Sequence, residues 1–159
     1  SNYVGAMTEA VKRLDSYGNK YQVKVILTQQ LTSATEMQNA YLTSAEISEC
    51  KAVKTVSDIL LLMRKVVNEL ELDEKNKDFF LRPYKLTKGM DGKWRKRYIT
   101  FTDDERKNNL YRLIFVNKNR HGAADDIILV RFDGLTGRFI EVGQCEHCSR
   151  KSFTQGRKY

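Results

Sequence analysis

The sequence contains few of the residues that break or cross-link a chain. It has one proline, Pro83, and three cysteines among 159 residues. An odd and low cysteine count does not fit a disulfide-stabilised secreted domain and suits a reducing compartment, so we expect a cytoplasmic protein. The longest apolar run, Ile59–Met63, is far too short to cross a bilayer, and no signal-peptide pattern is visible. We therefore expect no membrane partner.

Charge of one sign is in excess. The chain carries 28 basic and 20 acidic residues, a formal net charge of +8, with 41% hydrophobic residues. This composition predicts one globular domain with a modest core rather than a disordered chain. A basic balance favours nucleic acid or another polyanion as partner, although many basic domains bind neither.

The first half of the chain alternates helical and β-rich patterns. Apolar residues at helical spacing predict helices over Thr8–Tyr17, with Thr8 as its cap, and Ser44–Thr55. Each is followed by a short apolar run, Val23–Leu27 and Ile59–Met63, which predicts a buried strand. A helix–strand–helix–strand order is typical of an α/β domain with a largely parallel sheet.

The alternation stops over residues 65–109. Two β-rich segments, Phe79–Leu86 and Lys93–Phe101, flank the turn signal Asp91-Gly92 and predict a hairpin. We interpret this region as an inserted β-arm. One face of the arm would be basic and aromatic, through Trp94, Arg95, Lys96, Arg97 and Tyr98. A solvated amphipathic hairpin with no ligand explains these residues equally well.

A second hairpin is predicted by Leu113–Gly122 and the return run Asp126–Phe132. Lys118 and Arg120 stand at its tip, two residues apart, so their side chains point the same way. Such a pair suits a phosphate, which arginine binds with a planar fork. The alternative is a solvated turn that happens to be basic.

Taken in order, these segments resemble the C-terminal half of the ATPase domain of DnaB-type replicative helicases, which have a RecA-like core. The resemblance covers most of residues 7–142 except the arm. The matching segments are the glutamine-ended strand Val25–Gln29, the helix-to-strand segment Glu49–Asp58 with Arg64, the hairpin Phe115–Gly122 with its return strand Val130–Phe132, and the pair Arg138-Phe139.

The resemblance implies a partial RecA-like α/β core with a mainly parallel sheet and a C-terminal antiparallel hairpin. It assigns residues 1–142 to this core, with 65–109 as the inserted arm and 143–159 as a basic, flexible tail. The phosphate-binding Gly-x-x-x-x-Gly-Lys-Ser/Thr loop and the magnesium-binding acidic strand end are missing. We therefore expect the C-terminal part of a longer helicase, inactive alone, whose intact form uses ATP and Mg²⁺ in a homo-hexameric ring.

The resemblance also implies roles for individual residues. Lys118 and Arg120 would reach the γ-phosphate held by a neighbouring subunit, where cations offset the charge of phosphoryl transfer. Gln29 would sense that phosphate, with Gln30 as the alternative. Single-stranded DNA would meet a central loop, for which the candidates are Thr32, Ser33, Thr35, Asn39 and Lys51. The arm lies outside the resemblance, but its charge and aromatic residues make Trp94, Arg95 and Arg97 further candidates for DNA contact.

Cys145-Glu-His-Cys148 supplies half of a tetrahedral zinc site, but the other half is missing, so we expect no bound metal.

Three rival interpretations of the whole chain stay open. The first is a RecA-like ATPase that does not unwind DNA. The second is a non-enzymatic basic module that binds single-stranded nucleic acid through Trp94 and its neighbours, and the third is a small zinc-dependent interaction domain.

Overall fold

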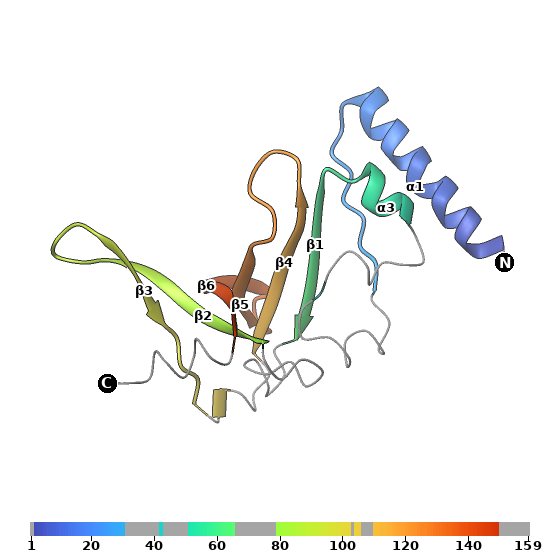
Figure 1. The fold of residues 1–159 in the computed structure, drawn as a ribbon. Coiled ribbons are helices and arrows are strands. Elements are labelled where there is room, and N and C mark those ends of the chain that lie inside the picture. Colours follow the sequence, from blue (N-terminus) through green and yellow to red (C-terminus); the bar gives the residue numbers. More distant parts are fainter. Residues whose placement is uncertain are drawn as a thin grey trace.

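The computed structural model describes residues 2–30, 42, 51–65, 79–102, 104–105 and 110–149. This part of the chain forms two main helices and one six-stranded sheet (Figure 1). In chain order the elements are α1 (Asn2–Tyr21), α3 (Lys51–Val56), β1 (Ile59–Lys65), β2 (Phe79–Lys88), β3 (Trp94–Tyr98), β4 (Tyr111–Asn119), β5 (Ile127–Asp133) and β6 (Arg138–Ser149).

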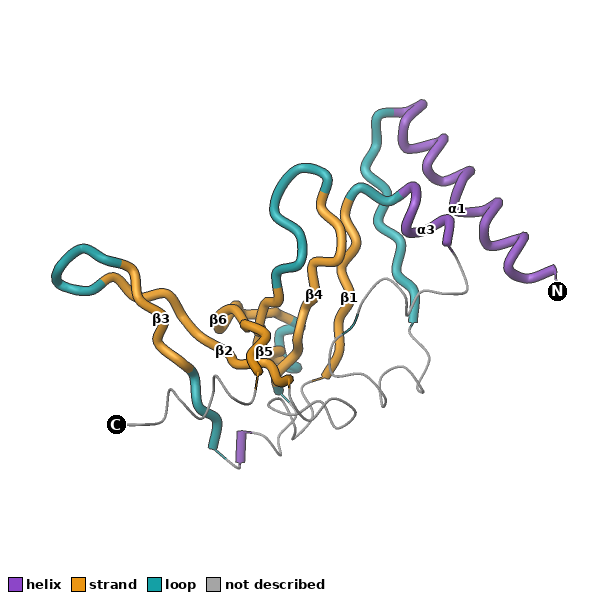
Figure 2. The backbone as a smooth tube through the Cα atoms, viewed as in Figure 1, coloured by secondary structure: helices purple, strands orange, loops and turns teal. Residues whose placement is uncertain are grey.

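The sheet has the strand order β1-β4-β5-β6-β2-β3, and every neighbouring pair is antiparallel. The β2–β3 hairpin projects from one end of the strongly twisted sheet, whereas α1 and α3 lie at the other end (Figures 1 and 2). Neither α1 nor α3 is long and apolar enough to span a membrane.

The expected fold class is therefore wrong. Instead of a mainly parallel RecA-like α/β core, the described residues form an all-antiparallel sheet with few helices. The predicted strand Val23–Leu27 is absent, because residues 23–30 belong to no helix or strand. The neighbour of β1 is β4, which runs antiparallel to it and pairs Leu62 with Phe115. The helix–strand rhythm of the sequence thus predicted β1 correctly but gave one strand too many, and it did not show which strands pair.

The core lies on one face of the sheet. Phe115 and Leu129 are almost completely buried there, together with Leu42, and Cys145 and Leu81 belong to the same cluster. β1 follows a strict alternation in which Leu60, Leu62 and Arg64 are buried and the intervening residues are exposed. The sequence predicted a buried strand because the residues on both faces of β1 are mostly apolar, but only one of these faces is covered.

Both helices differ from their predicted bounds. α1 begins before Thr8, which lies inside the helix and so does not cap it, and continues past Gly18 to Tyr21. The left-handed residue that ends it is Gln22, with φ 53°, and the amide of Val23 donates to the carbonyl of Gly18. Of the predicted helix Ser44–Thr55, residues 44–50 lie outside the described part, and 51–56 form α3.

Candidate nucleic-acid interface

The hairpin predicted around Asp91-Gly92 is confirmed as β2–β3, and its turn is held by local contacts. The amide of Lys93 donates to Oδ1 of Asp91 at 3.2 Å, and the amide of Gly89 donates to the carbonyl of Lys93 at 2.9 Å. Gly92 has φ +75°, a conformation that side-chain-bearing residues rarely adopt. β2 also pairs with β6, so the hairpin continues the main sheet.

Residues paired across a β-ladder point to the same face of the sheet. Tyr84 pairs with Tyr98 and Lys88 with Trp94, and alternation along β3 adds Lys96 to the same side. We call this the aromatic–basic face. Its members are Arg82, Tyr84, Leu86, Lys88, Trp94, Lys96 and Tyr98, and it is the face opposite the core residues Leu81 and Cys145.

Cations and rings on this face are in direct contact. The guanidinium of Arg82 lies over the ring of Tyr98 at 3.3 Å from its centroid, and the ammonium of Lys96 lies over the ring of Tyr84 at 4.5 Å. The two rings meet edge to face with centroids 6.5 Å apart. These contacts orient the aromatic groups, while Trp94, further along β3, stays 65% exposed.

Glu146 is the acidic member of this surface. It pairs with Arg82 across the β2–β6 ladder, and its carboxylate forms an ion pair with Lys96. The hydroxyl of Tyr98 donates to its other oxygen at 2.8 Å. The hydrogen bond to Glu146 raises the pKa of Lys96, so this ammonium is charged at physiological pH. Burial, followed by the hydrogen bond to Glu146, raises the pKa of Tyr98 and keeps its hydroxyl a donor.

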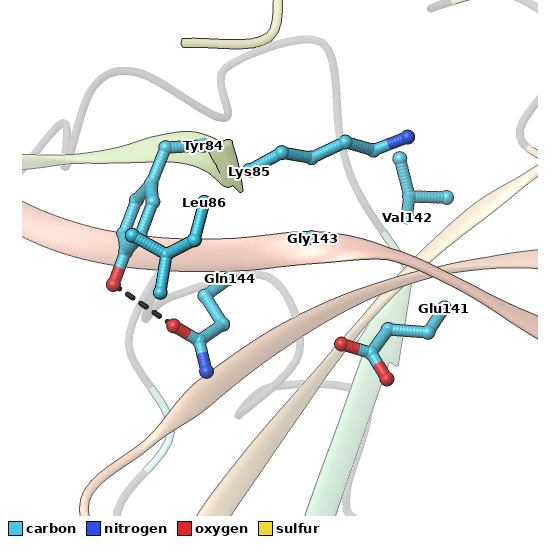
Figure 3. Close-up of a pocket in the computed structure, with 7 residues that line it drawn as sticks. All are labelled: Tyr84, Lys85, Leu86, Glu141, Val142, Gly143 and Gln144. Atoms are coloured by element: carbon cyan, nitrogen blue, oxygen red, sulfur yellow. Dashed lines mark hydrogen bonds between the residues drawn. The ribbon is translucent and has the colours of Figure 1, made fainter. Parts of the chain in front are cut away.

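A shallow hollow of about 440 Å³ lies where the hairpin leaves β6 (Figure 3). It is lined by residues 84–86 of β2 and 141–144 of β6. The hydroxyl of Tyr84 donates to Oε1 of Gln144 at 3.0 Å, as drawn in Figure 3. Gly143 is required here, because a Cβ atom at this position would collide with the carbonyl oxygen of Tyr84. The strands therefore cross in close contact at the base of the hairpin.

The predicted DNA-binding residues of the arm divide between the two faces. Trp94 lies on the aromatic–basic face, whereas Arg95 and Arg97 alternate to the opposite face, where Arg97 pairs with Lys85. Arg95 forms an ion pair with Asp91 at 2.6 Å, which holds it over the turn. Sequence reasoning missed Arg82 and Tyr84, although their spacing of two residues on a predicted strand was an available signal.

The two cations predicted as a γ-phosphate finger make internal contacts. Nζ of Lys118 donates to the carbonyls of Lys54 at 2.7 Å and Thr55 at 3.2 Å. Arg120 donates to Oδ1 of Asp58 at 2.8 Å and to the same carbonyl of Thr55 at 3.3 Å. Both side chains therefore point the same way, as alternation requires, and they bind the C-terminal end of α3 and the turn into β1.

The remaining candidates are separate from this surface. Gln29 is exposed in the segment after α1, outside any helix or strand, and Gln30 follows it there. Lys51 is the first residue of α3. The loop candidates Thr32, Ser33, Thr35 and Asn39 lie outside the described residues.

Cys145 of the proposed half-site for zinc belongs to the core. Its thiol is buried beside Ile127 and Leu129, and burial raises its pKa to about 12. Burial therefore disfavours the thiolate form, which is the form that ligates metals. Among the residues that the structure describes, no three His, Cys, Asp or Glu side chains are grouped to hold a metal ion. Residues 143–149, expected to begin the tail, belong to β6.

Comparisons with known proteins add no relative to this picture. No protein-family model matches the chain, and neither the curated proteins nor the solved structures searched contain a match.

Proposed function

We propose that this chain binds single-stranded nucleic acid and that the aromatic–basic face of the β2–β3 hairpin is the contact surface. The observation that carries the proposal is the presence of three aromatic rings and three cations on one face of two adjacent strands. Binding of this kind combines stacking of unpaired bases on aromatic rings with cations that follow the phosphate backbone.

The charge of the chain is concentrated in this hairpin. Residues 79–98 contain seven basic residues and one acidic residue, a net charge of +6, whereas the whole chain carries +8. Each lysine or arginine that neutralises a phosphate releases a condensed counterion, and this release supplies most of the sequence-independent affinity. The hairpin therefore offers both an attractive field and individual phosphate contacts.

The aromatic residues distinguish this surface from an ordinary basic hairpin. A solvated face has no need of a large exposed ring, yet Trp94 is 65% exposed at the far end of the hairpin, opposite Lys88. Tyr84 and Tyr98 extend the row of rings towards the main sheet. Because bases are inaccessible inside a duplex, a row of rings that includes the exposed Trp94 and Tyr98 favours single strands over double-stranded DNA.

The proposal can be tested with the only tryptophan of the chain. We expect a fluorescein-labelled twelve-nucleotide oligothymidylate to bind the purified protein and to quench the fluorescence of Trp94. Trp94→Ala removes one stacking contact, worth about 1–3 kcal/mol, so the Kd from fluorescence anisotropy rises by about tenfold or more. A Trp94→Ala variant that binds as tightly as the natural sequence would exclude this surface.

Two lysines of β2 provide a matched comparison. Lys88 lies on the aromatic–basic face and Lys85 on the other, and both are exposed. Lys88→Gln removes a phosphate contact, so we expect about fivefold weaker binding at 0.1 M salt and a log–log salt slope shallower by about 0.7. Lys85→Gln removes the same charge from the opposite face and leaves the slope unchanged. Equal effects of the two changes would mean that the net charge alone attracts the nucleic acid.

Single-stranded DNA is also the partner that the helicase resemblance implies. The binding experiments test the hairpin surface itself, however, and their outcome does not depend on the resemblance. ATP-coupled unwinding by a longer protein remains a prediction from the hairpin sequence at residues 115–122. The antiparallel sheet removes the fold argument for it, and the internal contacts of Lys118 and Arg120 give these cations a second role.

A further inference from the structure

Glu146 occupies an unexpected position, because a carboxylate lies in the middle of the surface that we propose for a polyanion. It lies on β6, opposite Arg82 of β2, on the aromatic–basic face. One of its oxygens forms the ion pair with Lys96 and the other accepts the hydroxyl of Tyr98 at 2.8 Å. Both donors come from β3, which does not pair with β6, so the carboxylate bridges strands across β2.

The donors that hold Glu146 are those that bind a phosphate. An ammonium, a phenol hydroxyl and an adjacent guanidinium make charge-assisted hydrogen bonds to any anionic oxygen, and a phosphodiester presents two such oxygens as a carboxylate does. The side chains of Lys96 and Glu146 are 43% and 22% exposed, so the ion pair can be reached from solvent. Lys96 is the more exposed partner, so a competing anion can approach its ammonium from solvent.

We propose that Lys96 and Tyr98, with Arg82 beside them, form a phosphate subsite whose position is filled by the Glu146 carboxylate in the unbound protein. This inference rests on the proposed function, and it names where one backbone phosphate of the single strand binds. The phosphate takes the place of the carboxylate, and the bases on either side stack on the row of rings that ends in Trp94. Glu146 thus competes with any incoming anion for these donors and lowers its affinity.

The test compares two carboxylates of β6 in the anisotropy assay described above. Glu146→Gln keeps the shape of the side chain and removes the ion pair with Lys96, so the phosphate no longer has to displace a carboxylate when it binds. We expect about fivefold tighter binding at 0.1 M salt and a salt slope steeper by about 0.7. Glu141→Gln removes the same charge from an exposed residue of the same strand, outside this ion pair, and leaves the slope unchanged. Binding by Glu146→Gln that is no tighter than binding by Glu141→Gln overturns the subsite.

A double-mutant cycle makes the result independent of any effect of a single variant on folding. Lys96→Met should weaken binding more strongly in the Glu146→Gln background, where the ammonium is free to contact phosphate, than in the natural background. Additive effects of the two changes contradict the proposal.

Inorganic phosphate, followed by ³¹P NMR, separates the subsite from the proposed function. If the oligonucleotide binds neither the natural protein nor Glu146→Gln, the proposed function fails. The subsite stands in that case only if Glu146→Gln binds inorganic phosphate and Glu146→Gln/Lys96→Met does not. Loss of binding to both ligands in Glu146→Gln overturns it.

Discussion

At the residue scale, cations of the same kind serve different purposes according to what surrounds them. Lys118 and Lys96 both end in an ammonium on a β-strand, and both have partners. The partners of Lys118 are backbone carbonyls at the end of α3, which leave that ammonium anchored to the fold. Lys96 instead pairs with a side chain that another anion can replace. The charge of a lysine therefore does not show whether it can bind a ligand, whereas the group with which it interacts does.

The contacts of Lys118 predict a measurable contribution to stability. Lys118→Met keeps the apolar stem but removes the donor to the last carbonyls of α3, so we expect the free energy of unfolding to fall by about 0.5–1 kcal/mol. Urea denaturation followed by circular dichroism measures the change. Lys24→Met serves as the control, because Lys24 is exposed in the segment after α1. Equal midpoints for the two variants would contradict a capping role.

At the element scale, the β2–β3 hairpin forms through contacts between neighbouring residues, but its position depends on a strand that is distant in the sequence. Its turn, its strands and its alternation depend on neighbouring residues, and the sequence predicted them. Its attachment to the sheet depends on β6, where Gly143 allows β2 to cross closely. Regular pairing of β6 with β2 places Gln144 and Glu146 on the face that carries Tyr84 and Tyr98. The binding surface therefore needs three strands, of which two are adjacent in the sequence.

Gly143 provides the test of this arrangement. In Gly143→Ala the new Cβ atom would collide with the backbone of Tyr84 and lie 2.9 Å from Cδ1 of Ile99, so β2 and β6 must separate. We expect a loss of about 1–3 kcal/mol in the free energy of unfolding.

Gly5→Ala is the matched control with the opposite sign. No atom lies within 4 Å of a Cβ placed at Gly5 in α1, and alanine is the better helix former by about 1 kcal/mol. Thermal unfolding of both variants should therefore shift the midpoint in opposite directions. An unchanged midpoint in Gly143→Ala would show that the crossing of β2 and β6 is not as close as described.

At the scale of the whole molecule, the sheet separates the surface that we propose for nucleic acid from the helices. The charged hairpin projects from one end of the sheet, and the helices lie at the other (Figure 1). The sequence contains no Gly-x-x-x-x-Gly-Lys-Ser/Thr loop to hold nucleotide phosphates.

We expect the purified chain to release no phosphate from ATP, with or without single-stranded DNA. A coupled phosphate-release assay measures this, and Arg120→Ala serves as the control for contamination. Activity that is equal in both proteins comes from a contaminant. Activity that disappears in Arg120→Ala would contradict the expectation and return Arg120 to a catalytic role.

What the sequence predicted was the local structure. Asp91-Gly92 predicted a turn, apolar runs predicted β1, β4 and β5, and alternation predicted that Lys118 and Arg120 point the same way. These features depend on backbone preferences and on residues close together in the chain. Turn signals and apolar runs indicate such elements, although the run Val23–Leu27 forms no strand, because no neighbouring strand pairs with it among the described residues.

Only the tertiary structure decided which strands are neighbours, and with that the direction of the sheet and the membership of the surface. The pairing of β1 with β4 replaced the expected parallel sheet, and the pairing of β6 with β2 brought Glu146 to Lys96 and Tyr98. The physical reason is that apolar periodicity specifies that a strand is buried but not by which partner. The choice of partner depends on contacts between residues that are far apart in the sequence, such as 96 and 146. Alternative strand pairings compete through such contacts only when the whole chain packs.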